Sequence, residues 1–347
     1  MPPISPRQAG FYMPAEWMPH QACWLAFPSH EDLWEGALTA TQQEVISLVR
    51  AIAVTEAVEL LVLNDAIADL ATHAFATLPV RLHHIPFGDI WMRDIGPIFV
   101  HHRTEHRIAS LTFAWNGWGH KYLLDHDALV SERVTNFLQE DQGIETFRHP
   151  WVLEGGAIEV DGMGTCLTTR QCLLNPNRNP AMGEGAIATG LMETLGVEKI
   201  LWLDQGLKND HTDGHIDTIA RFVAPHTVAC MTPTRSDDPN YRVLNDIQQQ
   251  LATYTDASGT PLKVVPIPSP GMIRDAAEEI MPASYLNFYI ANGRVIMPLY
   301  GSEMDEEALR AIAACFPDRQ VIGLMAKHIL RGGGAFHCIT CHQPMMG

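Results

Sequence analysis

Short apolar runs alternate along the chain with segments whose apolar residues recur at helical spacing. Residues 21–27 and 58–64 are short apolar runs rich in β-prone residues, a pattern typical of buried strands. Between them, the segment 39–55 places its apolar residues three and four positions apart, at Val45, Leu48, Val49 and Ile52. The pattern therefore predicts a strand, a helix and a second strand.

The same alternation continues to the end of the chain. We predict further helices over residues 68–78, 127–139, 184–195, 240–254 and 305–316. Short predicted strands lie between them, and the pairs Asp161-Gly162 and Asn292-Gly293 are typical of tight hairpin turns. Five rounds, each a helix with about three strands, follow one another at roughly 60-residue spacing. Strand pairs outnumber helices, which favours a radial α/β arrangement over an open doubly wound sheet.

Composition is that of a globular protein. Hydrophobic residues make up 46% and charged residues 18% of the 347 residues, enough for a large core. This length fits two domains or one closed α/β unit, so it leaves the domain count open. The formal net charge of −17 disfavours nucleic acid and anionic lipid as partners and favours cationic ligands, although acidity can also serve solubility alone.

Cysteine usage and the N-terminal sequence indicate a cytoplasmic protein. Seven cysteines are scattered over the chain, an odd number that does not fit a small disulfide-stapled secreted fold. The start MPPISPRQAG lacks the basic and apolar regions of a signal peptide. No run of about 18 apolar residues occurs, so we expect no membrane association.

The segment 331–340, RGGGAFHCIT, is the first candidate for chemistry. Three consecutive glycines allow positive φ angles and close approach to a ligand, and they lead to Cys338 directly behind His337. A thiol presented by a glycine-rich turn suggests a nucleophile in a tight pocket. The alternative is a loop followed by an ordinary buried cysteine, since free cysteine is commonly buried.

Four loops place polar residues among glycines or aromatic residues at predicted strand ends. They cover residues 91–97, 154–156, 211–217 and 332–338. Together they supply a thiol, an imidazole and several carboxylates. Carboxylates suit a cationic substrate, because a planar guanidinium is held best by two-point hydrogen bonds from Asp or Glu.

At this point the chain resembles the agmatine deiminases of the guanidine-modifying (pentein) superfamily. The resemblance runs nearly end to end through FYMPAEW, HQACWLAFP, WMRDIGP, EGGAIEVDGMGT, CLLNPNRNP, GHIDTIARFV, SYLNFYIANG and GGGAFHCIT. It implies a five-bladed ββαβ pseudo-symmetric α/β propeller around a central pocket. It also implies one catalytic domain covering residues 1–347.

The resemblance also implies roles for individual residues. Cys338 is similar to the family's nucleophile and His215 to its general acid and base, while Glu154 resembles the glutamate that borders the histidine. The expected substrate-binding residues are Trp91, Asp94, Asp213 and Asp217. Alternatives from the residues alone are an ion pair between Asp94 and Arg93, a strand-end cap at Asp217, a turn glutamate at Glu154 and a core position for Trp91.

The implied reaction is hydrolytic deimination of a small cationic guanidine, with no metal and no organic cofactor. Agmatine would give N-carbamoylputrescine and ammonia through a covalent amidino-cysteine, a step of polyamine biosynthesis leading to putrescine. The rival substrates are peptidyl-arginine and other alkylguanidines. A homo-oligomer is possible.

A metal- or haem-binding module is the rival from another class. Cys338, Cys341 and His342 spell the C-x-x-C-H haem-attachment pattern. Covalent haem attachment requires export, and a zinc site requires further ligands, but neither a signal peptide nor a second C-x-x-C is present.

The sequence departs from the family pattern where the far end of a substrate would be read. Ala335 stands where many agmatine deiminases have asparagine, Cys341-His342 stands where they have glutamines, and the loop 30–36 differs from its usual form. We expect the acidic loops, Asp213 among them, to repel a substrate carboxylate and so to favour agmatine over arginine by about a hundredfold.

Overall fold

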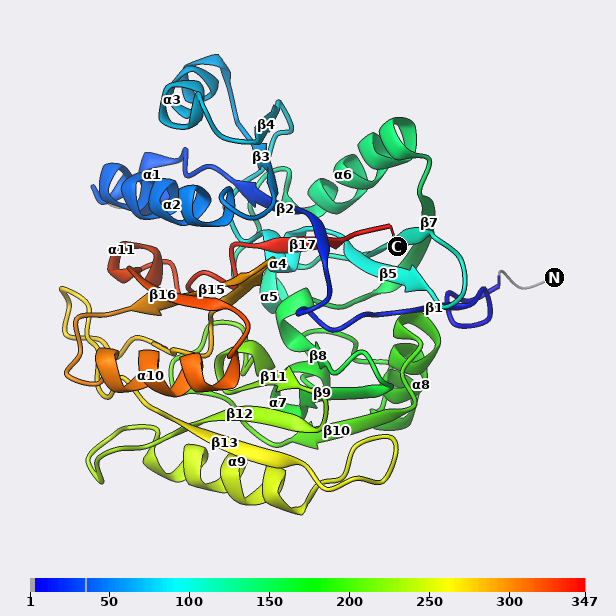
Figure 1. The fold of residues 1–347 in the computed structure, drawn as a ribbon, viewed down its shortest axis with the longest axis vertical. Helices are drawn as coiled ribbons and strands as arrows, with labels where there is room; N and C mark the ends of the chain where they lie inside the picture. Colours follow the sequence, from blue (N-terminus) through cyan, green and yellow to red (C-terminus); the bar gives the residue numbers. More distant parts are fainter. Residues whose placement is uncertain (1–3, 35, 347) are drawn as a thin grey trace.

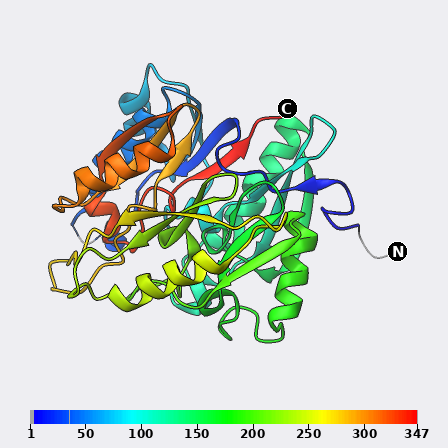
Figure 2. The same cartoon turned by 60° about the horizontal axis from the view of Figure 1, so that its bottom comes forward.

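Five small β-sheets stand around a common centre, and the longer helices lie on their outer side (Figure 1). The structure is a computed structural model that describes residues 4–34 and 36–346. The same arrangement is visible in the turned view of Figure 2. The α/β five-bladed architecture expected from the resemblance is confirmed.

Each sheet repeats one plan: an antiparallel strand pair, then a helix, then a strand that returns parallel to the second strand. The first sheet along the chain contains β2 (His20–Ala26), β3 (Ala57–Leu61), β4 (Val80–His83) and β17 (Cys341–Pro344). Its helices are α1 (Glu31–Trp34), α2 (Leu38–Ile52) and α3 (Asp65–Phe75). The second sheet contains β1 (Phe11–Tyr12), β5 (Ile98–His102), β6 (Ile108–Ala114) and β7 (Glu145–Val152). Its helices are α4 (Met92–Ile95), α5 (Gly117–His120) and α6 (Asp127–Gln142).

The other three sheets have three strands each. One contains β8 (Glu159–Val160), β9 (Thr165–Thr169) and β10 (Lys199–Leu203), with the 3-10 turn η1 (Gly155–Ala157) and helices α7 (Arg170–Leu173) and α8 (Glu184–Leu195). The next contains β11 (Ala220–Ala224), β12 (Thr227–Thr232) and β13 (Lys263–Pro268), with η2 (Ile216–Thr218) and α9 (Tyr241–Thr253). The last contains β14 (Tyr289–Ala291), β15 (Arg294–Leu299) and β16 (Gln320–Met325), with α10 (Asp305–Cys315), and is followed by α11 (Lys327–Leu330).

The two ends of the chain close the ring of sheets. β17 pairs antiparallel with β2, with Cys341 opposite Trp24 and His342 opposite Cys23. Figure 1 shows the red terminal strand beside the blue one. The indole Nε1 of Trp24 donates a hydrogen bond of 2.9 Å to Gln343 Oε1. This closure fixes the segment just before β17, which carries Cys338.

The predicted helices occur close to their expected positions because their apolar stripes face the sheets. In α2, Val45, Leu48, Val49 and Ile52 are all buried. The helix α3 begins at the cap Asn64, whose side chain accepts a hydrogen bond from the amide of Ile67, and this sets its start earlier than predicted.

The strand β4 is short. It pairs with β3 only from Val80 to His83, and Pro86, which has no amide hydrogen to donate to a sheet, follows soon after it. No helix in the described part of the chain is long and apolar enough to span a membrane.

Candidate active site

Loops from different sheets meet at a cavity of about 180 Å³. That is small beside pockets for drug-sized ligands, which measure about 300–1,000 Å³. Three of the predicted loops contribute to its wall: Trp91 and Asp94 from the first, His211 and Thr212 from the third, and Gly332, Gly333, Gly334 and Cys338 from the fourth. Leu33, Asp89, Trp118, Tyr122, Leu124 and Arg331 complete it.

The thiol of Cys338 faces this cavity and is held by one asparagine. The side-chain oxygen of Asn287 accepts hydrogen bonds from the amides of Ala335 (3.1 Å) and Cys338 (3.2 Å). Its Nδ2 lies 3.1 Å from Cys338 Sγ, and Asp217 Oδ2 lies 3.6 Å from the same sulfur. Burial raises the pKa of the thiol well above its usual range, and the negative charges of Asp217 and Asp94 raise it further. A bound cation would oppose those two charges and favour the thiolate.

The triple glycine is required by close packing against Trp91. A Cβ at Gly332 would lie 2.4 Å from the Trp91 ring, and one at Gly334 would lie 2.8 Å from it and 2.9 Å from Cys338 Sγ. Gly333 has a φ of +102°, which side chains rarely allow. The sequence predicted close approach to a ligand; in this structure Gly332 and Gly334 approach the ring of Trp91 closely.

Asp94 lies in the cavity wall and is not paired with its neighbour Arg93. Its Oδ2 accepts a 2.9 Å hydrogen bond from Trp118 Nε1, and its Oδ1 accepts one of 3.0 Å from the amide of Gly156. Burial raises the pKa of Asp94 to about 6, against the opposing charge of His215. The guanidinium of Arg93 instead lies 3.6 Å from Glu16. The ion-pair alternative for Asp94 is therefore wrong.

Asp217 is fully buried beside the thiol, at the centre of η2. Its Oδ2 accepts hydrogen bonds from His337 Nδ1 (2.7 Å) and Asn287 Nδ2 (3.3 Å). Its Oδ1 has no hydrogen-bond partner among the described residues. Burial alone would raise the pKa of Asp217, but the hydrogen bond from His337 together with the charges of His337, His215 and Arg221 outweighs it, and the pKa is lowered. The carboxylate binds side chains rather than capping a strand end, so that alternative is wrong too.

Asp94, Asp217 and His215 converge on one glycine. A Cβ at Gly156 would lie 2.5 Å from His215 Nδ1, 3.0 Å from Asp94 Oδ1 and 3.2 Å from Asp217 Oδ2. Only a glycine leaves room for three polar groups to gather there. This convergence explains why position 156 is a glycine.

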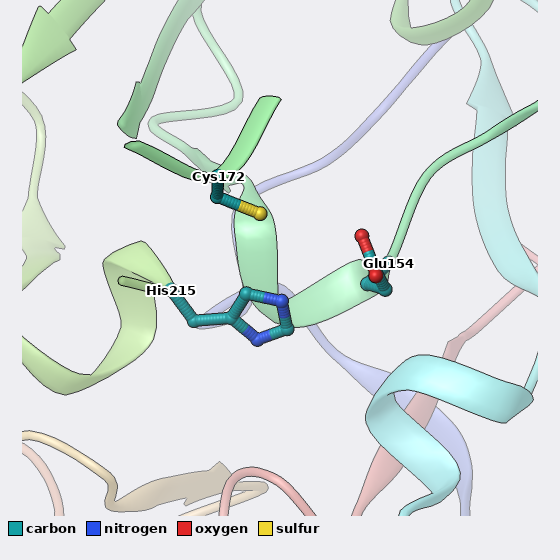
Figure 3. A group of neighbouring side chains, drawn as sticks. All are labelled: Glu154, Cys172 and His215. Atoms are coloured by element: carbon teal, nitrogen blue, oxygen red, sulfur yellow. The ribbon is translucent and has the colours of Figure 1, made fainter. Parts of the chain in front are cut away.

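His215 stands between Asp94 on one side and Glu154 with Cys172 on the other. Its Nδ1 lies 3.8 Å from Asp94 Oδ1, and Figure 3 shows its other nitrogen facing Glu154 and Cys172. Burial alone would lower the pKa of His215, but the charge of Asp94 and the neighbouring Cys172 and Glu154 outweigh it and raise the pKa well above its usual range. This imidazole therefore readily carries a proton.

Asp213 was expected to bind substrate, and the structure corrects this expectation. Its carboxylate is outside the cavity wall and accepts hydrogen bonds from Lys121 Nζ (2.6 Å), Arg178 Nη1 (2.7 Å) and Asn177 Nδ2 (3.0 Å). Two cations therefore neutralise it. Trp91, by contrast, lines the cavity and donates a 2.7 Å hydrogen bond to Asp89 Oδ2.

A buried network behind Asp217 was not predicted. His337 Nε2 lies 2.8 Å from Glu16 Oε2, which also accepts a 2.9 Å hydrogen bond from Arg221 Nη2. Only the position of His337 next to Cys338 offered a signal in the sequence. Glu16 and Arg221 are separated from the thiol by long stretches of sequence, so no local pattern marks them.

Cys341 and His342 are in β17 and do not form a metal cluster with Cys338. Cys341 Sγ donates to the carbonyl of Pro97 at 3.2 Å, and the ring of His342 stacks on His20 at 4.9 Å. Among the residues that the structure describes, the group with metal-ligand geometry is a different one, Glu154, Cys172 and His215.

Comparison with known proteins gives the family. Residues 12–344 match the Porphyromonas-type peptidyl-arginine deiminase family. The chain belongs to this family. Agmatine deiminase of Medicago truncatula is 36% identical over 378 residues, covering 98% of each protein.

Two solved structures extend the similarity of this peptidyl-arginine deiminase family member. Agmatine deiminase of Enterococcus faecalis superposes with a TM-score of 0.93 at 32% identity, over 100% of this chain and 99% of the other. A C. jejuni agmatine deiminase with one cysteine replaced by serine and substrate bound has a TM-score of 0.86 at 28% identity, over 96% of both chains. The resemblance stated from the motifs is confirmed.

Proposed function

We propose that this protein hydrolyses the guanidinium group of agmatine to give N-carbamoylputrescine and ammonia. The observation that carries the proposal is that Cys338 and Asp94 line one small cavity, with Asp217 Oδ2 3.6 Å from the Cys338 sulfur and His215 Nδ1 3.8 Å from Asp94 Oδ1. Relatives named agmatine deiminase over nearly the whole chain support agmatine as the substrate.

Substrate binding rests on the two buried carboxylates. We place the guanidinium between Asp94 and Asp217, where Asp217 Oδ1, which has no partner among the described residues, can accept one of its N–H groups. Each carboxylate can form charge-assisted hydrogen bonds, which are stronger than those between neutral groups. Trp91 and Trp118 form apolar walls beside the bound group.

Attack begins when the Cys338 thiol releases its proton to solvent as the cationic substrate binds, and the thiolate sulfur then bonds to the guanidinium carbon. The cationic substrate stabilises the thiolate, because it offsets the charges that raise the thiol pKa. In the tetrahedral centre, His215 donates a proton to one nitrogen, the C–N bond breaks and ammonia leaves. The product of this half-reaction is an amidino-cysteine.

Hydrolysis then uses the same histidine in the opposite direction. His215 takes a proton from water, the water oxygen bonds to the amidino carbon, and the C–S bond breaks. The ureido product leaves and the thiolate regains a proton. These steps use side chains of this chain alone, and we propose that no metal or organic cofactor takes part.

The proposal predicts a covalent intermediate on one cysteine. Enzyme quenched during turnover of agmatine should carry an amidino group on the peptide that contains Cys338, detected by mass spectrometry. In His215→Ala the adduct should accumulate further if its hydrolysis slows more than its formation. Cys338→Ser is the control and should carry none, and an adduct on another cysteine would show that the wrong thiol was assigned.

The neighbouring thiol should matter little. Cys341→Ser should change kcat/KM for agmatine by less than about threefold, because a hydroxyl can keep the hydrogen bond to the Pro97 carbonyl. Steady-state kinetics and thermal unfolding measure this. A loss as large as that caused by replacing Cys338 would revive a paired role for Cys338 and Cys341.

We further propose a cytoplasmic location and a place in polyamine biosynthesis toward putrescine. All seven cysteines are free thiols, which supports a reducing compartment. We propose a single catalytic domain over residues 1–347, a small cationic guanidine as the partner, no nucleic acid or membrane partner, and a possible homo-oligomer.

A further inference from the structure

A second set of chemically reactive groups lies behind the cavity. Glu154, Cys172 and His215 each offer one donor atom, and these atoms lie within 4.8 Å of one another. Glu154 immediately precedes η1, Cys172 is in α7 and His215 immediately precedes η2, and the three side chains point toward a common space (Figure 3). Glu154 and Cys172 are 0% exposed and His215 is 1% exposed.

Several of these donors lack a partner. Glu154 Oε1 accepts a 2.6 Å hydrogen bond from Arg178, but its Oε2 has no partner among the described residues, and neither ring nitrogen of His215 has one. Since Nδ1 of His215 is on the Asp94 side, the nitrogen that faces Glu154 and Cys172 is Nε2. Buried polar atoms without partners are costly and uncommon, so these atoms mark a place for a ligand.

We propose that Glu154, Cys172 and His215 form a binding site for Zn²⁺ that inhibits the enzyme. One thiolate, one imidazole and one carboxylate form a donor set that Zn²⁺ accepts, with a fourth position left for water. The inhibition rests on the proposed function, because it depends on the role of His215 in proton transfer. The binding of the metal does not rest on the proposed function.

The geometry is close to what the ion requires. Bond lengths of about 2.0–2.3 Å imply donor-to-donor distances of about 3.3–3.6 Å in a tetrahedral site, so donors that lie within 4.8 Å of one another must approach by up to about 1.5 Å. Asp94 adds negative charge 3.8 Å from His215, whereas Arg178 opposes the metal from the far side of Glu154. The cavity reaches Asp94, so a cation entering by the substrate path arrives beside the cluster.

The bound metal would block the proton relay and leave Cys338 uncoordinated. Binding of Zn²⁺ displaces the proton of the Cys172 thiol and the proton on His215 Nε2 to solvent, and the metal takes the freed lone pairs. His215 then can neither protonate the leaving nitrogen nor accept a proton from water. A guanidinium between Asp94 and Asp217 would repel the metal, so agmatine should weaken Zn²⁺ inhibition.

The test uses the full-length metal-free enzyme with Zn²⁺ for inhibition and Co²⁺ as a spectroscopic probe. In the wild type, Zn²⁺ should inhibit turnover and a chelator should reverse the inhibition. With Co²⁺, the wild type should show a thiolate-to-cobalt charge-transfer band. Cys172→Ala should lose the band and raise the Zn²⁺ concentration for half-inhibition by about tenfold or more. Cys166→Ala, equally buried but in β9, should keep both, and each variant is compared with its own rate without metal.

Two further variants separate the outcomes. The cobalt band should persist in Cys338→Ser. This variant tests metal binding without activity, so its result can be interpreted even if the proposed reaction is wrong. Loss of the band in Cys338→Ser would place the metal on the nucleophile and overturn the proposal, as would unchanged inhibition in Cys172→Ala. Cys172→Ser replaces the alanine variant if that protein does not fold, with the same expected loss of the band.

Discussion

Cys338→Ser should lower kcat for agmatine by a factor on the order of 10³ or more while leaving the fold intact. A serine hydroxyl ionises far less readily than a thiol, and the cation that favours the thiolate cannot compensate for that difference. The hydrogen bonds from Asn287 to the backbone at Ala335 and Cys338 do not involve the sulfur. They should therefore survive, so thermal unfolding should change little.

Substrate binding separates this result from a folding defect. Agmatine should still raise the unfolding temperature of Cys338→Ser, because Asp94 and Asp217 remain in place to bind the guanidinium. Cys341→Ser is the matched control, since it makes the same chemical change in a buried thiol outside the cavity wall. Retention of a tenth of wild-type turnover by Cys338→Ser would refute the nucleophile assignment.

Local patterns sufficed for most helices and for the five-sheet plan. The stripe of Val45, Leu48, Val49 and Ile52 predicted α2 within a few residues of its observed ends. The strand β17 was missed because its four residues contain a proline and show no alternation. Its partner β2 is at the other end of the sequence, and a strand specified by such a distant partner leaves no local signal.

The candidate site shows the same limit. The resemblance named Cys338, His215, Asp94 and Asp217, and the structure brings these residues together. The sequence could not exclude Asp213 from the site. A carboxylate in an acidic loop looks the same in sequence whether it faces a cavity or is paired with two cations. Asn287 was missed for the opposite reason. It positions Cys338 through a contact between residues 51 positions apart in the sequence, and no local pattern marks such a contact.

Agmatine should be preferred over free arginine by about a hundredfold in kcat/KM, but for a different reason from the one the sequence suggested. Asp213 is neutralised by Lys121 and Arg178, so it cannot repel a substrate carboxylate. The carboxylate of Asp89 does line the cavity, and it is held by Trp91 Nε1 and the amide of Ile90. A like charge about 6 Å away costs about 3 kcal/mol at an effective dielectric constant of about 20.

The cation Arg331 also lines the cavity, but it is exposed. An exposed ion pair contributes only about 0–1 kcal/mol, so Asp89 should decide the preference. Burial raises the pKa of Asp89 to about 6. The carboxyl group becomes neutral as the pH falls through that value, so the preference should be full at pH 8 and reduced at pH 5.

The measurement compares ammonia release from agmatine, arginine and a peptide with C-terminal arginine, each as kcat/KM. Asp89→Asn should reduce the preference for agmatine about tenfold or more, because the amide keeps the shape of the wall and removes the charge. Asp237→Asn is the control, since Asp237 is exposed and paired with Arg235. Faster turnover of the peptide would make peptidyl-arginine the substrate. Equal turnover of arginine and agmatine by the wild type would contradict the electrostatic argument, because a cavity that repels carboxylates should favour the substrate that carries a second positive charge in place of one.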